Sequence, residues 1–206
     1  MAEFVVGSSV TANQLKDLFR QFADGSLNGI HLQALLEHRN SFPKEDDKTT
    51  SHLKLISSGT FLTLPATDGT RTIAQAADVF TGGIDNDFKL WKLDVPSTPT
   101  KPMSVKVWEQ TTEGMFADIF ASTGQPNDAL CIPQNQILSF AATYPEWLRK
   151  DGFGTFFMFK ENEKFFVAGV SFDDARRLCV RVDPLSRGDV WGAEYRSRFV
   201  LPQLPV

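Results

Sequence analysis

The chain has 206 residues, of which 42% are hydrophobic and 22% are charged, and its formal net charge is −4. This length suits one large domain or two small ones, and the acidic balance argues against non-specific coating of nucleic acid. Two cysteines, Cys131 and Cys179, are too few for a disulfide framework. Because neither a secretory signal nor a long apolar run is visible, we expect a soluble cytoplasmic protein that does not enter a membrane.

Two amphipathic helices are predicted near the beginning of the chain. Thr11 and Gln14 form a T-x-x-Q capping box, and apolar side chains then recur at spacings of three and four residues until Gly25. Ser26 is placed to cap a second helix that reaches about residue 39, and Pro43 follows it. The short connection between these segments predicts a helical hairpin.

Short strands and one short helix are predicted next. Residues 52–56 and 60–64 have the composition of strands, and the Ser-Ser-Gly sequence between them predicts a hairpin. A second T-x-x-Q box precedes a predicted helix at residues 73–80. Residues 88–93 are predicted as a further strand.

Three prolines within residues 96–103 predict an extended connector. This connector separates an N-terminal α+β region, residues 1–95, from a C-terminal α+β region, residues 104–206. The alternative is a single domain in which the prolines form a rigid surface loop.

The C-terminal region combines helical and strand-like patterns. Helical spacing of apolar residues appears at residues 113–121 and again after Pro133. Five strands are also predicted, and the middle three have the spacing of an antiparallel meander. We therefore predict an α+β fold, in which an N-terminal helical hairpin with short strands precedes C-terminal helices packed on an antiparallel three- to four-stranded meander. The five strands are residues 104–108, 155–160, 165–172, 178–182 and 198–201.

No catalytic group of residues is recognisable. His31 and His38 are separated by about 10.5 Å along a helix, too far to share a metal ion. Cys131 stands near a predicted helix start, where the helix dipole favours a thiolate, but a buried structural thiol is the commoner role of such a residue. We therefore predict no catalytic residue, no metal site and no cofactor.

Glycines, aspartates and aromatics also gather without matching a ligand motif. Asp85, Asp87 and Asp94 lack the spacing of a calcium loop, and Gly82-Gly83 fits neither of the glycine patterns that bind nucleotides. Residues 152–157 are similar in part to the aromatic strand of RNA-recognition motifs. The basic residue and two of the aromatic residues of that motif are missing here. Core packing is the preferred interpretation of these rings.

Arginines concentrate in the last third of the chain. Residues 149–198 hold 10 Lys/Arg against 8 Asp/Glu, and six of the ten arginines lie between Arg176 and Arg198. We expect Arg196 and Arg198 to share a face of the last strand, with Arg181 on a neighbouring strand, so that the three grip a phosphate or carboxylate. The alternative is a solvated sheet face whose charges only oppose aggregation.

Two aromatic residues accompany these arginines. Trp191 and Tyr195 are four residues apart, and Trp, Tyr and Arg are enriched at interface hot spots. Burial of the rings in the core is the alternative. The predicted partner is a protein, an anionic ligand or a nucleic acid. The predicted binding residues are Arg181, Arg196, Arg198, Trp191 and Tyr195.

Several segments resemble an uncharacterised family of bacterial proteins. They are residues 15–40, residues 78–82 with 84–85, residues 147–159 and residues 190–203. The resemblance implies a bacterial, cytoplasmic protein, and it implies no activity, ligand or site residue.

The leading functional hypothesis is a non-enzymatic binding module that uses the Arg- and Trp-bearing C-terminal sheet. One alternative is an enzyme whose site is assembled from distant residues, for example Cys131 with a histidine. The other is a self-associating structural protein that buries surplus phenylalanine, of which the chain has 18, between protomers.

Overall fold

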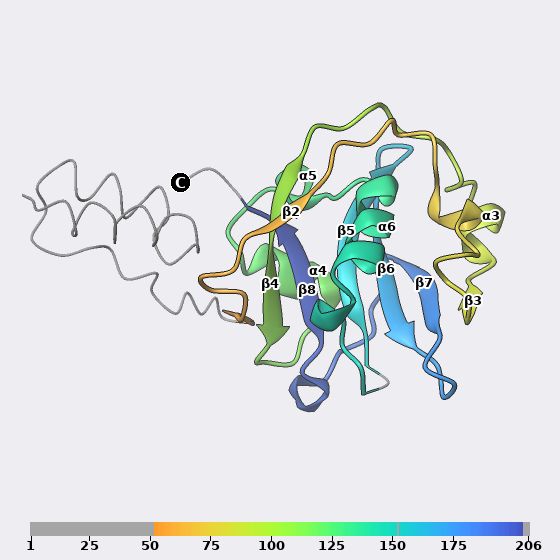
Figure 1. Ribbon diagram of the computed structural model, residues 1–206. Coiled ribbons are helices and arrows are strands. Elements are labelled where there is room, and N and C mark those ends of the chain that lie inside the picture. The colour runs from red at the N-terminus through yellow and green to blue at the C-terminus, as the bar shows by residue number, and fades with distance from the viewer. Residues whose placement is uncertain (1–51, 152, 204–206) are drawn as a thin grey trace, which may run out of the picture. The chain divides into compact units, whose positions relative to one another are not determined.

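The computed structural model describes residues 52–151 and 153–203, which fall within one of the two units of the chain (Figure 1). An eight-stranded mixed sheet dominates this unit, in the order β1-β4-β8-β5-β6-β7-β3, with β2 also paired to β4. The β5–β8 and β3–β7 pairs are parallel, and the remaining pairs are antiparallel. The strands are β1 (Leu53–Leu55), β2 (Leu62–Leu64), β3 (Gly83–Ile84), β4 (Met103–Gln110), β5 (Thr155–Glu161), β6 (Lys164–Phe172), β7 (Leu178–Pro184) and β8 (Arg198–Pro202).

The predicted fold class is wrong. The predicted helical hairpin at residues 11–39 lies outside the described residues, and the described part is one large mixed sheet with few, short helices. The three C-terminal strands do pair as an antiparallel meander, but β8 attaches to it in parallel and connects it to β4. The meander is therefore one half of a continuous sheet. Strands from both sides of the proline-rich segment 96–103 belong to this sheet.

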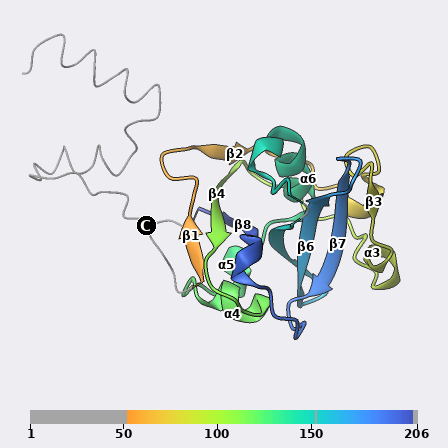
Figure 2. The ribbon, with the colours of Figure 1, turned by 90° about the horizontal axis from the view of Figure 1, so that it is seen from below.

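Short helices cover the two faces of the sheet (Figures 1 and 2). One apolar cluster contains residues of α6, η1 and α3, and the other contains residues of α4 and α5. The sheet lies between these clusters, as the view from below shows (Figure 2). The helices are α3 (Asp87–Leu90), α4 (Phe116–Ala121), α5 (Asn127–Leu130) and α6 (Gln134–Thr143), with the short 3-10 helices η1 (Ile73–Gln75), η2 (Pro145–Trp147) and η3 (Ala193–Tyr195).

Strand β5 shows how the sequence encodes this layering. It begins Thr-Phe-Phe-Met-Phe, and all five residues are buried. Phe157 and Phe159 pack in the cluster with α6, whereas Phe156 and Met158 pack in the cluster with α4 and α5. A strand that is covered on both faces carries a continuous apolar run rather than an alternating pattern.

Strands β1 and β2 do not form the predicted hairpin. Both pair with β4, β1 at its C-terminal half and β2 at its N-terminal half. Between them the Ser57 hydroxyl accepts a hydrogen bond from Val107 N at 2.8 Å, and Val107 O accepts from the backbone N of Ile56 and Ser57. Ser57 therefore forms hydrogen bonds with the backbone of β4 in the gap between its pairing with β1 and its pairing with β2.

Three consecutive buried amides at the start of α6 fasten the loops before it. Gln134 Nε2 donates to Leu93 O at 2.6 Å, and its Oε1 accepts from Ile73 N at 3.1 Å. Asn135 and Gln136 make similar bonds to residues 97, 65, 100 and 101. These bonds connect the proline-rich segment to the start of the helix.

The predicted strand at residues 88–93 is instead the short helix α3 and the turn that follows it. Phe88 N donates to Asp85 O and Trp91 N donates to Asp87 O, as a helical turn requires. Phe88 is fully buried against Phe159, whereas Leu90 is 72% exposed. The apolar pattern of this segment therefore reflects one buried ring and an exposed apolar turn rather than strand pairing.

Candidate functional site: an arginine–aromatic cluster at one end of the sheet

The five predicted binding residues do not form one surface. Arg181 lies on β7 and Arg198 begins β8, and strands β5 and β6 separate these two strands in the sheet. Three strand spacings correspond to about 14 Å. Arg196 is not extended either, because it has a left-handed backbone (φ 47°) at the end of η3. The structure thus brings Arg196 and Arg198 together and leaves Arg181 apart.

Trp191 is partly buried and packs against the apolar cluster that contains α4 and α5. Its ring centroid lies 4.9 Å from that of Phe116 and 4.9 Å from that of Phe156. Its backbone carbonyl accepts a 2.7 Å hydrogen bond from the Gln110 side chain. These contacts agree with the alternative of core packing for this residue.

Arg198 is the residue around which a polar cluster forms. Its Cα faces Thr155 on β5 and Glu109 on β4, and its backbone N donates to Gly154 O. Its half-buried guanidinium donates through Nη1 to the carbonyls of Glu146 and Leu148, at 3.3 and 3.2 Å. The Nε atom is buried and has no hydrogen-bond partner among the described residues.

A second half-buried arginine, Arg149, lies beside Arg198. Its backbone N donates to the Thr155 hydroxyl at 2.8 Å, which anchors it to the β5 residue opposite Arg198. Its side chain is 17% exposed and pairs with the exposed carboxylate of Asp151 at 3.3 Å. Like that of Arg198, its Nε atom is buried and unpartnered among the described residues.

The two guanidinium groups interact unfavourably. Burial lowers the pKa of Arg198, and the charge of Arg149 lowers it further, whereas Glu109 and Asp151 act in the opposite direction. Each guanidinium has five N–H groups, and the hydrogen bonds described above leave several of them unused. An anion placed between the two arginines would offset their repulsion and accept the free donors.

An aromatic pair adjoins these arginines. The rings of Phe153 and Tyr195 are stacked with centroids 5.0 Å apart, and the Arg149 guanidinium lies 5.9 Å from the Phe153 ring centroid. Tyr195 is 39% exposed, so its ring offers an accessible face. Arg149, Phe153, Tyr195 and Arg198 together are called the arginine–aromatic site below.

Arg196 forms the rim of this site. Its Nε and Nη2 atoms both donate to Glu109 Oε1, at 3.0 and 2.7 Å, while the Arg196 side chain remains 62% exposed. Glu109 is 14% exposed, so the arginine partly shields it from solvent. Because the Glu109 carboxylate is paired with Arg196, it neutralises the half-buried Arg149 and Arg198 less fully.

Sequence inspection missed half of this site. Phe153 belongs to the segment compared with an RNA-binding strand, and its ring does stack, but on Tyr195 of the same chain. Arg149 lies in a short charged stretch, followed by Lys150 and Asp151, that matches no binding motif. It meets Arg198 because β5 and β8 are parallel neighbours, whose first residues lie at the same end of the sheet, the lower end in Figure 1.

The alternative of a cysteine nucleophile finds no support in the geometry. Burial, reinforced by the nearby charge of Asp128, raises the pKa of Cys131 to about 12. Its thiol lies 3.2 Å from the Asn127 carbonyl, to which it donates. A thiol in this state is protonated at neutral pH and is a poor nucleophile. His31 and His38 lie outside the described residues, and within the described ranges no group of three or more metal-ligating side chains is present.

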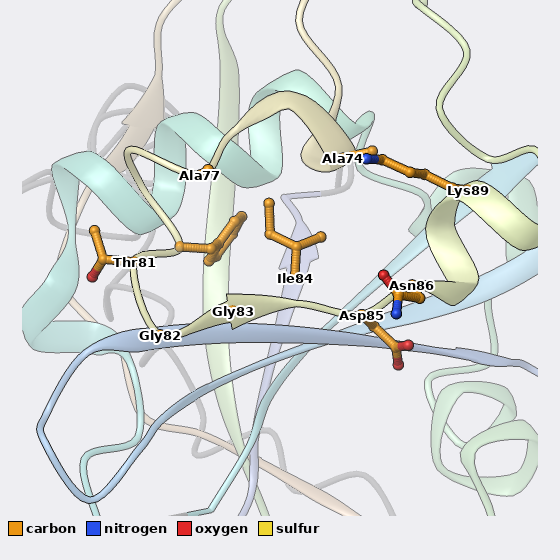
Figure 3. A pocket seen from close by; sticks show the side chains of 10 residues that line it. Ala74, Ala77, Thr81, Gly82, Gly83, Ile84, Asp85, Asn86 and Lys89 are labelled. Carbon is orange, nitrogen blue, oxygen red and sulfur yellow. The ribbon is translucent and has the colours of Figure 1, made fainter.

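The predicted glycine–aspartate segment turns out to border a pocket of about 350 Å³ (Figure 3). It lies between the η1 region and β3, and its lining includes Gly82, Gly83 and Lys89. The glycine pair indicates a turn, but nothing in the sequence pattern indicates a cavity here. The pocket shares no residue with the arginine–aromatic site.

Comparison with models of protein families, with curated proteins and with solved structures gives no match for this chain. In the part of the chain that the structure describes, no helix combines the length and the apolar character needed to cross a bilayer. What the two sites can bind therefore follows from their own geometry.

Proposed function

We propose that this protein is a non-enzymatic binding protein that captures a protein partner through the arginine–aromatic site. The observation that carries the proposal is the pair of half-buried guanidinium groups of Arg149 and Arg198 beside the stacked rings of Phe153 and Tyr195. The Nε atom of each arginine is buried and has no hydrogen-bond partner within residues 52–151 and 153–203. The partner chemistry is a side-chain carboxylate next to an apolar group. The carboxylate would bind the arginines, and the apolar group would pack on Tyr195.

The composition of the site supports a protein partner. Arginine and tyrosine are residue types that carry most of the binding energy at interfaces, because they combine apolar area with hydrogen-bond donors. Asp151, the present partner of Arg149, is 67% exposed, and an exposed ion pair contributes little stability. A partner carboxylate can therefore replace it at small cost.

Charge argues against nucleic acid as the partner. Binding to a nucleic acid backbone requires several cations that each neutralise a phosphate. Here Glu109 and Asp151 already stand against three arginines, Arg149, Arg196 and Arg198. The chain as a whole carries a net charge of −4.

The proposal is tested with fluorescein-labelled probes and the full chain. The probes are a short peptide that alternates Glu with Leu, the same peptide with Gln in place of Glu, and a short oligothymidylate. Fluorescence polarisation is measured for the wild type and for Arg149→Gln and Tyr195→Ala. Arg181→Gln is the matched control, because Arg181 is an exposed arginine on β7, away from the site.

We expect the acidic peptide to bind the wild type more tightly than the Gln peptide does. Each site variant should weaken this binding at least about tenfold, whereas Arg181→Gln should leave it unchanged. Equal binding of the acidic peptide to the wild type and to both site variants would contradict the proposal. Tight binding of the oligothymidylate that depends on Arg149 would replace the protein partner with a nucleic acid.

We further propose a cytoplasmic location. Cys131 and Cys179 are both free thiols, which fits a reducing compartment. Fractionation of the cells that produce the protein, followed by immunodetection, tests this: recovery in a membrane or extracellular fraction would contradict it.

A further inference from the structure

The pocket beside β3 is hollow because four of its ten lining residues are alanine or glycine. Ala74 and Ala77 form one side, and Gly82 and Gly83 form part of the opposite side (Figure 3). A Cβ atom at Gly82 would lie 2.6 Å from the Cys179 sulfur, so only glycine fits where this segment approaches β7. Gly83 has a φ of 139°, a backbone conformation that other residues rarely adopt.

The bottom of the pocket is apolar and firmly held. Phe80 is 1% exposed, and Ile84 packs against the same apolar cluster. Figure 3 shows Ile84 pointing from β3 toward Ala77 and Ala74. The β3 segment is fixed to β7 by Gly82 N donating to Leu178 O at 2.8 Å and by Asp85 N donating to Val180 O at 2.9 Å. The cavity is therefore a preformed feature of the sheet edge, as is typical of small-molecule pockets.

The two charged side chains that line the pocket, Lys89 and Asp85, have different orientations. Lys89 extends from α3 toward the side of Ala74, whereas the Asp85 carboxylate points away from the cavity (Figure 3). Asp85 Oδ1 also accepts a 3.1 Å hydrogen bond from Asp87 N, which holds its carboxylate at the start of α3. Lys89 forms no ion pair with a carboxylate of the described residues. The amide of Asn86 lies near it at the same end of the cavity.

We infer that this pocket binds a small amphiphilic monocarboxylate. The apolar body of the ligand lies on Phe80 and Ile84 between the small residues, and its carboxylate faces the Lys89 ammonium, with the Asn86 amide as a further donor. A volume of about 350 Å³ limits the ligand to a small molecule, because it lies near the lower end of the range for ligand pockets. An exposed lysine contributes modestly, so selection by charge is small but measurable.

The experiment uses three probes with the same ring and different ends: phenylacetate, phenylacetamide and phenethylamine. Binding to the full, ¹⁵N-labelled chain is followed by NMR through the backbone amides of Gly82 and Gly83. The variants are Lys89→Gln, which removes the charge, and Ala77→Leu, which fills the cavity. Lys92→Gln is the matched control, since Lys92 is an exposed lysine just after α3 that does not line the pocket.

For the wild type we expect the acid to bind about fivefold more tightly than the amide, which corresponds to about 1 kcal/mol, and the amine to bind most weakly. Lys89→Gln should remove the preference for the acid, Lys92→Gln should preserve it, and Ala77→Leu should abolish binding of all three probes. Equal affinity of acid and amide for the wild type, an unchanged preference in Lys89→Gln, or no perturbation of Gly82 and Gly83 by the acid would overturn the inference. Because Lys89 is exposed, its substitution leaves the fold intact and keeps the test valid even if Ala77→Leu does not fold.

Discussion

Replacement of Gln134 by methionine tests how strongly the buried amides of α6 hold the fold together. Gln134 is 5% exposed and satisfies two backbone groups, the carbonyl of Leu93 and the N–H of Ile73. Both of those residues are fully buried, so neither group gains a water molecule when the amide is lost. Methionine has nearly the same length and shape, and it removes the hydrogen bonds without opening a large cavity.

The expected loss in free energy of unfolding follows from the two backbone groups, Leu93 O and Ile73 N–H, that lose their hydrogen-bond partner. Each unsatisfied buried donor or acceptor costs about 1–3 kcal/mol, and the added apolar surface of methionine returns roughly 1 kcal/mol. We therefore expect Gln134→Met to lower the free energy of unfolding by about 3 kcal/mol. For a unit of this size the melting temperature should fall by about 6–12 °C.

Urea unfolding followed by tryptophan fluorescence measures this change. All four tryptophans lie between Trp91 and Trp191, so the signal reports on the described part of the chain. Gln125→Met is the matched control, because Gln125 is exposed, and its free energy of unfolding should stay within about 0.5 kcal/mol of the wild type. A loss below about 1 kcal/mol for Gln134→Met, with an unchanged denaturant slope, would refute the importance assigned to these bonds.

Three further outcomes are expected. Glu163→Gly should raise the urea midpoint, because Glu163 has a left-handed backbone (φ 60°) in the tight β5–β6 turn, which favours glycine; a lower midpoint would contradict this. Gly169→Ala should cost about 1–3 kcal/mol, since its Cβ would lie 3.0 Å from the enclosed Phe156 ring, whereas Gly188→Ala meets nothing and should be nearly neutral. Iodoacetamide should modify Cys131 up to ~10³-fold more slowly than in the urea-unfolded chain, because its pKa is raised from 9.0 to about 12; equal rates, determined by mass spectrometry, would show that the thiol is not buried.

Local patterns in the sequence predicted strands better than they predicted pairing. The predicted ends of β4, β5, β6, β7 and β8 all lie within two residues of the observed ends. The pairing of β5, β6 and β7 was also predicted, as a meander, but the partners of β4 and β8 were not, because they depend on contacts between distant segments that no local pattern records. The insertion of β8 between β4 and β5, in parallel with β5, is the clearest example.

Burial on two faces explains why the fold class was wrong. An antiparallel meander with one solvated face alternates apolar and polar residues, and β7 partly does so, with Arg181 between Val180 and Val182. β5 does not alternate, and its continuous apolar run indicates a central strand with helices on both sides. The run was visible in the sequence, but short apolar runs do not identify which strands lie beside them.

The density of charged residues along the chain predicts only part of the candidate site, because it does not record which strands are neighbours. A count of arginines along the chain includes Arg181 in the site and omits Arg149, because it assumes that residues close in sequence are also close in the sheet. Parallel neighbours begin at the same end of the sheet, so Arg149, which lies shortly before β5 and donates to the hydroxyl of its first residue, meets Arg198 at the start of β8, although the two are distant in sequence. Antiparallel neighbours would have placed the starts of the two strands, and with them the two arginines, at opposite ends of the sheet. Burial lowers the pKa of Arg198, and the charge of Arg149, which strand order brings beside it, lowers this pKa further. The anion proposed between the two guanidinium groups would relieve their repulsion.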